Sequence, residues 1–330
     1  MTQVKRPVIV CIGAGRMGRG IAHAFAYAGH PVRLIDIKPR DEASQRQLFA
    51  EASSEIRGSL GSVAEIGGFD PRAVDPIMRR VELCPRGQAK MSLQGVRYIF
   101  EAVPETLEAK ASALALIDQI AEPESIIAST TSTFLSTQLA DLSGRPRFFL
   151  NVHWLNPAFL VPLVEVSPTG ATERVVVETM MNLLISIGKV PVECGASPGY
   201  IVPRIQALAM NEAARLVEEG VATAEDIDKA VHFGFGFRFA VLGLLEFIDW
   251  GGGDILYYAS QYLSGALKSD RFEAPAIVKA NMAEGRNGLR DGKGFFDYSN
   301  RDLRAYRLSR LSEFMRTLQQ AGLARPPADL

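Results

Sequence analysis

The pattern of apolar and polar residues changes character at about residue 196 and divides the chain into two parts. Before that point, short apolar runs alternate with segments of helical period, starting with the largely β-branched run at residues 8–12. From Tyr200 onward nearly every segment has helical period, and no convincing strand is present. Alternating strands and helices are typical of an open α/β sheet. We therefore predict an α/β domain over residues 1–195 and an all-helical domain over residues 196–330.

The same pattern predicts individual elements. Strands are expected at residues 8–12, 31–36, 96–102, 125–128, 147–152, 160–166 and 190–193, and helices at 17–28, 41–64, 104–121 and 173–187. In the second part, helical period covers residues 203–219, 224–231 and 244–263. Gly29 and Gly220 suit the left-handed position that ends a helix. The charged helical stretch after about residue 299 is predicted to be an appended arm or an oligomer contact.

A glycine-rich turn joins the first predicted strand to the first predicted helix. Gly13, Gly15 and Gly18 form a Gly-x-Gly-x-x-Gly motif, whose glycines permit a sharp turn, close approach of a pyrophosphate and tight helix packing. The second strand ends in Asp36, 18 residues after Gly18, near the spacing of a carboxylate that binds ribose hydroxyls. These features predict an NAD site, because the charge of Asp36 repels the 2′-phosphate of NADP. Two cations within residues 38–40 soften this preference unless they lie in a solvated loop.

Composition and charge exclude several other classes of protein. The chain has 330 residues, of which 47% are hydrophobic and 22% charged, with a net charge of −1. This composition is ordinary for a soluble two-domain protein and gives no reason to expect nucleic acid or a membrane as partner. The three cysteines show neither metal-ligand spacing nor a disulfide framework. We expect a cytoplasmic, metal-free protein without a targeting or membrane-spanning segment.

Two candidate proton-transfer residues lie at neighbouring predicted strands. His153 follows one strand, and Glu165 lies on the next, 12 residues later. Ligands of open α/β sheets bind outside the carboxyl ends of the strands. A carboxylate beside a histidine fixes its tautomer and raises the basicity of the imidazole. Taken alone, such a pair is more often a structural histidine and an unimportant loop carboxylate.

Further motifs relate His153 and Glu165 to a known family. The chain resembles the 3-hydroxyacyl-CoA dehydrogenase family over roughly residues 7–298. The resemblance implies an N-terminal Rossmann-type domain, a helical C-terminal dimerisation domain and a substrate cleft between them. The matching segments, in the order and at the intervals of the family, are residues 13–22, Asp36, 101–110, 128–132, 153–157, 162–166, 198–202 and 292–298.

The resemblance also assigns roles to individual residues. His153 would be the general base in alcohol oxidation, Glu165 would hold it, and Ser132 would hydrogen-bond the reacting oxygen. For Glu105 and Lys110 the simpler alternative is a helix-surface pair, and for Asn156 it is a turn. The residues that the resemblance places at the cofactor are Gly13, Gly15, Met17, Gly18, Asp36, Glu105, Lys110, Asn156 and Arg290, the last where the family has a lysine.

Two segments depart from the family in ways that bear on catalysis and on coenzyme A. Family members usually have an asparagine that donates toward the reacting oxygen, where this chain has Pro203. Losing one such donor typically costs about 2.7–4 kcal/mol of transition-state stabilisation. Gln206, on nearly the same helical face, is either a substitute donor or a surface residue. Residues 57–66 carry hydroxyls but one cation only, fewer than a nucleotide with several phosphates usually attracts.

A third departure concerns the substrate. Residues 234–243 are more similar to relatives that act on small free carboxylates, such as L-gulonate and L-carnitine dehydrogenases. Arg238 is a candidate for a bidentate pair with a substrate carboxylate, or else bridges helices or subunits. The phenylalanines of this region, Phe233, Phe235, Phe237 and Phe239, are expected to belong to the core rather than to a substrate wall.

These observations lead to two hypotheses about function. The favoured one is an NAD-dependent dehydrogenase, acting as a homodimer through the helical domain, that interconverts a secondary 3-hydroxyl and a ketone. Its substrate is either a 3-hydroxyacyl-CoA such as 3-hydroxybutyryl-CoA or a small free 3-hydroxycarboxylate. The alternative is an NAD(H)-binding protein of low turnover with a structural or accessory role, for which Pro203 is the only motive.

Overall fold

The computed structural model describes residues 6–327, which fold into two compact units that divide between Ala209 and Met210. The predicted boundary at residue 196 lies between the last strand, β8 (Val190–Glu193), and the helix α8 (Val202–Glu218). Helix α8 itself continues from the first unit into the second. Among the described residues no single helix is long and apolar enough to cross a membrane, although one pair of helices bent by 84° reaches that length and composition together.

The first unit contains an eight-stranded sheet in the order β3-β2-β1-β4-β5-β6-β7-β8. Neighbouring strands are parallel except for β6 and β7, which are antiparallel. The α/β architecture predicted from the sequence is therefore confirmed. The strands before β8 are β1 (Ile9–Ile12), β2 (Val32–Asp36), β3 (Val81–Pro85), β4 (Tyr98–Glu101), β5 (Ile126–Ser129), β6 (Phe149–Trp154) and β7 (Leu163–Pro168).

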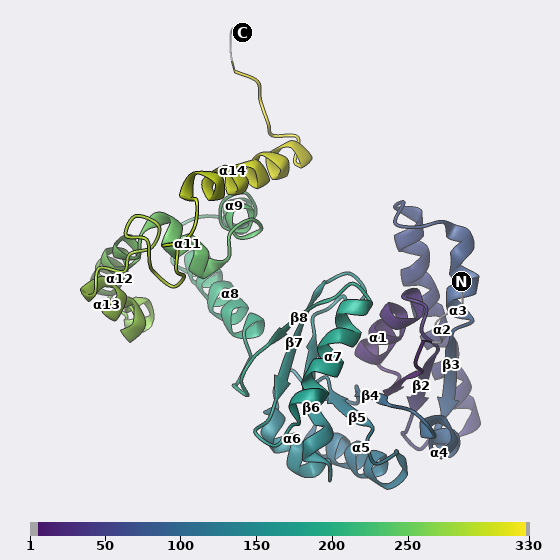
Figure 1. The fold of residues 1–330 in the computed structure, drawn as a ribbon. Coiled ribbons are helices and arrows are strands. Elements are labelled where there is room, and N and C mark those ends of the chain that lie inside the picture. Colours follow the sequence, from purple (N-terminus) through teal and green to yellow (C-terminus); the bar gives the residue numbers. More distant parts are fainter. Residues whose placement is uncertain (1–5, 328–330) are drawn as a thin grey trace. The chain divides into compact units, whose positions relative to one another are not determined.

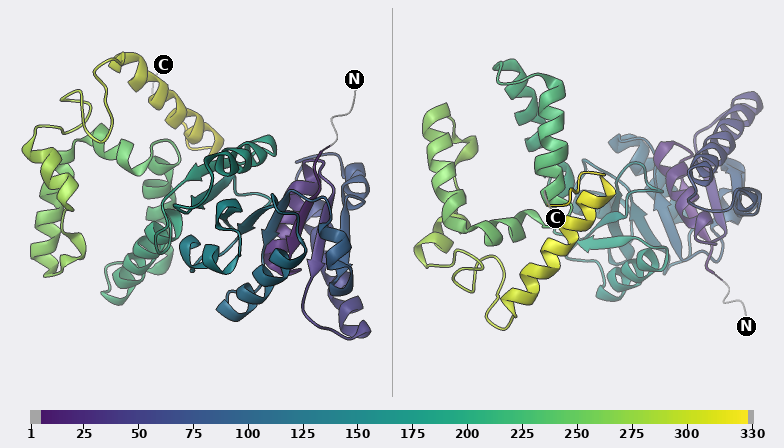
Figure 2. Two further views of the ribbon diagram at one scale, coloured as in Figure 1. Left: turned by 60° about the horizontal axis from the view of Figure 1, so that its bottom comes forward. Right: turned by 90° about the horizontal axis from the view of Figure 1, so that it is seen from above.

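Helices cover both faces of the sheet (Figures 1 and 2). Successive side chains of a strand point to opposite faces, so β1 contributes Ile9 and Cys11 to one apolar core and Val10 and Ile12 to the other. The first core also receives side chains from α1, α2 and α7, and the second from α4, α5 and α6. The helices of this unit are α1 (Arg16–Tyr27), α2 (Glu42–Glu65), α3 (Val74–Met78), α4 (Ala89–Leu93), α5 (Leu107–Ile120), α6 (Ser136–Leu142) and α7 (Arg174–Ser186).

The second unit is helical, as predicted, and differs from the expectation in one place. The helical period predicted over residues 244–263 is confirmed, and Gly252, with φ of +112°, divides this segment into α11 and α12. The expectation that the phenylalanines belong to the core is wrong for Phe233 and Phe235, whose residues are 55% and 45% exposed. The helices after α8 are α9 (Ala224–Ala230), the π-helical turn η4 (Val231–Gly236), α10 (Phe237–Phe239), α11 (Leu244–Gly251), α12 (Gly253–Leu267), α13 (Ala276–Ala283) and α14 (Leu303–Gln320).

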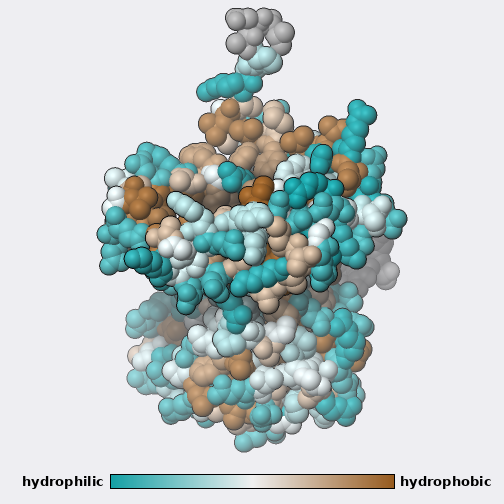
Figure 3. Space-filling model, turned by 90° about the vertical axis from the view of Figure 1, so that its left-hand side faces the viewer, coloured by the Kyte–Doolittle hydropathy of each residue, from teal (hydrophilic) through white to brown (hydrophobic). Residues whose placement is uncertain are grey.

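Many large apolar side chains of the second unit are open to solvent. Figure 3 shows hydrophobic residues, in brown, at the surface of the face turned toward the viewer. On α12, Ile255, Tyr258 and Tyr262 follow one another at helical spacing and are 63%, 58% and 74% exposed. This row of α12 residues is an apolar stripe that no other described element of the second unit covers.

Candidate active site

The glycine-rich turn between β1 and α1 has the shape that a pyrophosphate requires. Gly13 has φ of +108°, and a Cβ there would lie 2.6 Å from the carbonyl oxygen of Ala102. A Cβ on Gly18 would lie 2.0 Å from the carbonyl oxygen of Gly13, so helix and turn pack too closely for any side chain. At Gly15, by contrast, a Cβ would meet nothing within 4 Å. This open space, at the N-terminus of α1 with its free N–H groups, fits a dinucleotide phosphate.

Asp36 lies at the carboxyl end of β2, next to the strand that leads into the glycine turn. Its Oδ2 accepts a hydrogen bond from Arg40 Nε at 2.7 Å, and its Oδ1 is 3.4 Å from the backbone nitrogen of Lys38. Arg40 lies in the exposed loop after β2 and is paired there with Asp36. The Oδ1 atom is engaged only by a long contact, which leaves it able to accept from a ribose hydroxyl.

Sheet register brings the two candidate proton-transfer residues together. In the antiparallel pair of β6 and β7, His153 lies directly opposite Glu165, so both side chains extend from the same face. His153 Nδ1 lies 2.7 Å from Glu165 Oε2, and His153 Nε2 lies 3.0 Å from the hydroxyl of Ser132. All three contacting groups come from the loop after β5 and from two adjacent strands.

The second oxygen of Glu165 is held by the start of α8. Its Oε1 accepts from the backbone N–H groups of Ile201 and Val202, at 2.9 and 2.8 Å. These are among the N–H groups that a helix leaves unpaired in its first turn. They supply hydrogen bonds to a carboxylate that is completely buried. Glu165 is thus fully hydrogen-bonded and fixed toward His153.

Tyr200 is a site residue that the sequence reasoning did not single out. Its ring lies 5.5 Å from that of His153, nearly parallel to it, and its hydroxyl donates to the carbonyl of Phe134 at 2.9 Å. Burial raises the pKa of its hydroxyl. Gly199 and Tyr200 both have positive φ, 74° and 44°, which turns the chain into α8. The Pro-Gly-Tyr sequence at residues 198–200 was the available signal.

Glu105 organises the loop that carries Ser132. Its Oε1 accepts from the hydroxyl of Thr131, from the backbone nitrogen of Ser132 at 3.1 Å, and from the nitrogen and hydroxyl of Thr133 at 3.1 and 2.8 Å. Burial alone would raise the pKa of Glu105, but the hydrogen bonds from Thr131 and Thr133 and the charge of Lys110 outweigh it and lower the pKa. Glu105 is therefore ionised and holds the hydroxyl of Ser132 near His153.

Lys110 is not on the helix surface, so the simpler alternative for this residue was wrong. It is completely buried, and its ammonium lies 3.2 Å from Oε1 of Glu101 and 3.2 Å from Oε2 of Glu105. Glu101 is also fully buried and accepts from the hydroxyl of Ser129 and the nitrogen of Val103. One cation thus links two carboxylates, and Lys110 reaches the loop after β5 only through Glu105.

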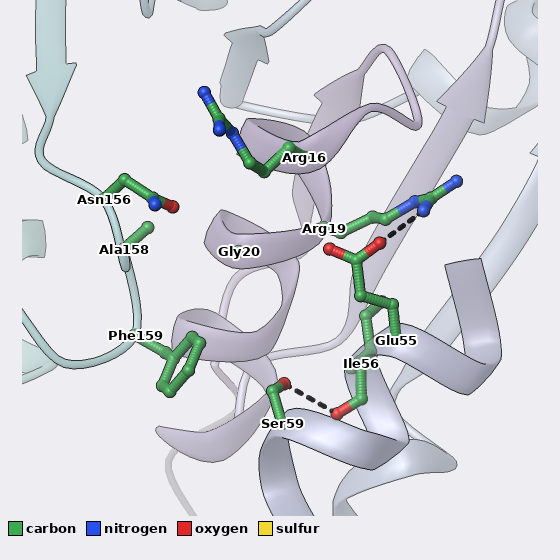
Figure 4. A pocket seen from close by; sticks show the side chains of 9 residues that line it. All are labelled: Arg16, Arg19, Gly20, Glu55, Ile56, Ser59, Asn156, Ala158 and Phe159. Carbon is green, nitrogen blue, oxygen red and sulfur yellow. Dashed lines mark hydrogen bonds and ion pairs between the residues drawn. The ribbon is translucent and has the colours of Figure 1, made fainter. Parts of the chain in front are cut away.

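The remaining predicted residues of the first unit lie around the start of α1. Met17 is partly buried against the first apolar core. Asn156, in the loop between β6 and β7, lines a small pocket of about 50 Å³ together with Phe159 of the same loop, and Arg16 of α1 lies opposite them (Figure 4). The other residues lining this pocket are Arg19, Gly20, Glu55, Ile56, Ser59 and Ala158.

The predicted residues from the start of α8 onward lie mostly at the surface or in ion pairs. Pro203 occupies the first turn of α8, where its missing N–H costs nothing, and Gln206 is exposed on the same helix. Arg290 pairs with Asp254 at 3.0 Å. Arg238 is exposed and lies 5.5 Å from the ring of Phe247, and no ion pair among residues 6–327 includes it. In that same range no group of three or more His, Cys, Asp or Glu is arranged to hold a metal ion.

Comparison with known proteins supplies the family context for this geometry. The family model for the NAD binding domain of 3-hydroxyacyl-CoA dehydrogenase matches residues 8–197, and the model for its C-terminal domain matches residues 199–298. A probable 3-hydroxybutyryl-CoA dehydrogenase of Bacillus subtilis is 30% identical over 293 residues, which are 89% of this chain and 98% of that protein.

Two further relatives extend the comparison. A 5-formyl-3-hydroxy-2-methylpyridine 4-carboxylate 5-dehydrogenase of Mesorhizobium japonicum is 30% identical over 92% of this chain and 94% of its own length. The crystal structure of a 3-hydroxyacyl-CoA dehydrogenase from Archaeoglobus fulgidus has a TM-score of 0.74 at 27% identity and covers 97% of this chain and all of that one.

Proposed function

Starting from the fact that this chain belongs to the 3-hydroxyacyl-CoA dehydrogenase family and is an NAD-dependent oxidoreductase acting on CH–OH groups, we propose that it oxidises a secondary 3-hydroxyl to a ketone with His153 as the base. The observation that carries the proposal is the continuous set of contacts from Ser132 through His153 to Glu165. It lies at the carboxyl ends of β5 and β6, in the same sheet as the glycine turn after β1.

Each of the three residues has a distinct task in this reaction. Glu165 accepts the Nδ1–H of His153, which leaves the Nε2 lone pair directed at Ser132 and available for a proton. His153 takes the proton of the substrate hydroxyl, and the positive imidazolium that results is stabilised by the Glu165 carboxylate. Ser132 hydrogen-bonds the same oxygen and so orients the carbinol carbon.

The cofactor is held, in this proposal, by the glycine turn and by residues on the adjacent strands. Bound NAD supplies the hydride acceptor. Gly13, Gly15, Met17 and Gly18 would receive its pyrophosphate at the start of α1, and Asp36 its adenosine ribose. Glu105 and Asn156 would line the cofactor. Lys110 would act through Glu105, because its ammonium is buried, and Arg290 stays a predicted cofactor residue of the second unit.

Two substrate classes remain to be separated by experiment. The family favours a 3-hydroxyacyl-CoA such as 3-hydroxybutyryl-CoA. The Mesorhizobium relative, by its name, acts on a pyridine carboxylate, and Arg238, which has no carboxylate partner among the described residues, suits a free 3-hydroxycarboxylate.

The test follows NADH absorbance over a panel of 3-hydroxyacyl-CoA thioesters and free 3-hydroxy acids, with NADH affinity measured in parallel by fluorescence. Turnover of one class identifies the substrate. If the free acids are turned over, Arg238→Ala should raise the KM for the best acid on the order of tenfold or more, because a bidentate charged pair is lost. An unchanged KM would remove Arg238 from the substrate site. Tight NADH binding without turnover of any substrate would instead support the low-turnover alternative, which the named relatives do not favour.

We also propose a homodimer formed through the helical domain of residues 196–330. The support for it is the apolar stripe of α12, together with the other exposed apolar residues of the second unit. A cytoplasmic location stays a prediction from composition and cysteine usage.

A further inference from the structure

Lys189 is a buried cation that the proposed reaction does not use. It directly precedes β8, is 8% exposed, and burial lowers its pKa. Among residues 6–327 no carboxylate lies within ion-pair distance of its ammonium. An ammonium group without a counter-ion is expensive to bury, so its hydrogen bonds must hold it in place.

Those hydrogen bonds go to one loop, residues 155–162, which joins β6 to β7. The ammonium donates to the carbonyl of Ala158 and to the carbonyl of Val161, both at 2.7 Å, and lies 5.5 Å from the ring centre of Trp154. The strand that carries His153 enters this loop, and the strand that carries Glu165 leaves it. Without Lys189, two carbonyl groups at the inner side of the loop would lose their partner.

The other side of the same loop lies against the helix that begins at the glycine turn. A Cβ on Gly20 would lie 3.0 Å from the Cβ of Ala158, so α1 and the loop are in close contact there. The ring of Phe159 stacks on that of His23 at 4.4 Å, with 5° between the planes. Figure 4 shows Asn156, Ala158 and Phe159 facing α1 across the small pocket.

We propose that Lys189 is a positioning residue: its ammonium fixes the loop of residues 155–162 against α1 and thereby sets Asn156 and His153 relative to the cofactor helix. The proposal rests on the proposed function for the roles of His153 and Asn156. It predicts that loss of the ammonium misplaces both the cofactor contact and the base, even though the hydrogen bonds of Lys189 go only to carbonyls of the loop.

The test compares Lys189→Met with Lys189→Arg, which keeps the charge and has N–H donors for both carbonyls. Lys90→Met, on the exposed face of α4, is the matched control. The Kd for NADH, kcat and Tm are measured for each. We expect Lys189→Met to raise the Kd for NADH and to lower kcat, each on the order of tenfold to a hundredfold, since small misplacements at a site have effects of that size. Lys189→Arg should recover most of both, and Lys90→Met should match the parent protein.

Lys189→Met with a lower Tm but with Kd and kcat within about twofold of the parent would overturn the proposal, because the residue would then be structural only. The Kd for NADH does not depend on the substrate, so failure to find any turnover would contradict the proposed function and leave this measurement intact. If Lys189→Met does not fold, Phe159→Leu loosens the same loop from its other side. A raised Kd for NADH in that variant supports the proposal, and an unchanged Kd overturns it.

Discussion

The two units of this chain bury apolar surface in different ways. The first unit encloses two cores, one on each face of its sheet, and both are complete within a single chain. The second unit buries few apolar residues and exposes many, the α12 stripe among them. Its buried apolar residues, within the described range, are Ile227, Leu242, Ala274, Val278, Leu289 and Tyr298.

In place of an apolar core, part of the second unit is organised around one buried carboxylate. Asp249 accepts from the backbone nitrogens of Phe295 and Phe296 and from the hydroxyl of Tyr298. A Cβ on Gly294 would lie 2.1 Å from Oδ1 of Asp249, so only glycine fits beside it. The Gly-Lys-Gly-Phe-Phe-Asp-Tyr motif at residues 292–298 therefore includes positions set by this contact.

The difference has a consequence for function. A sheet covered by helices on both faces is a self-sufficient scaffold, and the contacts of Ser132, His153 and Glu165 are made entirely within it. Helices that expose an apolar stripe need a covering surface, which a second copy of the chain supplies in the proposed homodimer. We therefore predict that the first unit supplies the proton-transfer groups and that the second unit supplies the surface for self-association. Four sets of substitutions test this comparison.

The largest expected effect comes from His153→Gln in the first unit. Losing the base should lower kcat by roughly a hundredfold to ten-thousandfold, the usual contribution of general base catalysis, while the Kd for NADH stays unchanged. Steady-state rates and NADH fluorescence check the two expectations. His30→Gln is the control, because His30 is equally buried but bonds only the carbonyl of Pro7. Unimpaired turnover in His153→Gln would show that the base lies elsewhere.

Next in size is the effect of charges on the apolar stripe of the second unit. Ile255→Asp combined with Tyr262→Asp should weaken self-association on the order of a hundredfold or more, because each buried side chain of this kind contributes about 1.5–3 kcal/mol. Sedimentation should then show the monomer mass of 35.9 kDa. Ile66→Asp, at an equally exposed position of the first unit, should leave the mass unchanged. A parent protein that is already monomeric would contradict the homodimer.

A smaller effect is expected at the start of α8, the helix shared by both units. Pro203→Asn introduces the side-chain donor that the family usually has, and should raise kcat about tenfold, part of the value of one such donor. Pro203→Ala removes the ring without adding a donor and should not raise kcat. Equal rates for the two variants would mean that another group already supplies the hydrogen bond to the reacting oxygen.

The smallest expected effect concerns stability and pH. Burial, followed by the charge of Lys189, lowers the pKa of His23 from 6.5 to about 4. The unfolded chain therefore binds a proton at His23 more readily than the folded chain does. The free energy of unfolding is not reduced by this difference above about pH 6.5, and it decreases as the pH falls from there toward 4. The loss amounts to at most about 3 kcal/mol.

Denaturation at several pH values should show a flatter profile in His23→Gln than in the parent. His232→Gln is the matched control in the second unit, where the histidine is exposed, and it should leave the profile unchanged. An identical pH profile for His23→Gln and the parent would mean that His23 is not the group that titrates.

Local signals account for much of what could be predicted. The strand at Ile9–Ile12, the glycine turn and Asp36 were predicted because each is encoded by neighbouring residues, and Gly29 has the predicted left-handed φ of +93°. Strand β3 (Val81–Pro85) was not predicted. It is a half-exposed edge strand containing charge and proline, so it lacks the apolar run that identifies the others.

By itself, then, the sequence determined the α/β class, the cofactor turn and the residue types of a proton-transfer site, since these depend on period and short-range spacing. Only the tertiary structure decided which groups meet. Strand register aligns His153 with Glu165, the first turn of α8 holds the second Glu165 oxygen, and Lys189 reaches back 31 residues to the Ala158 carbonyl. The last two contacts join segments more than 30 residues apart, and their partners are backbone groups that every residue carries, so no sequence pattern marks them.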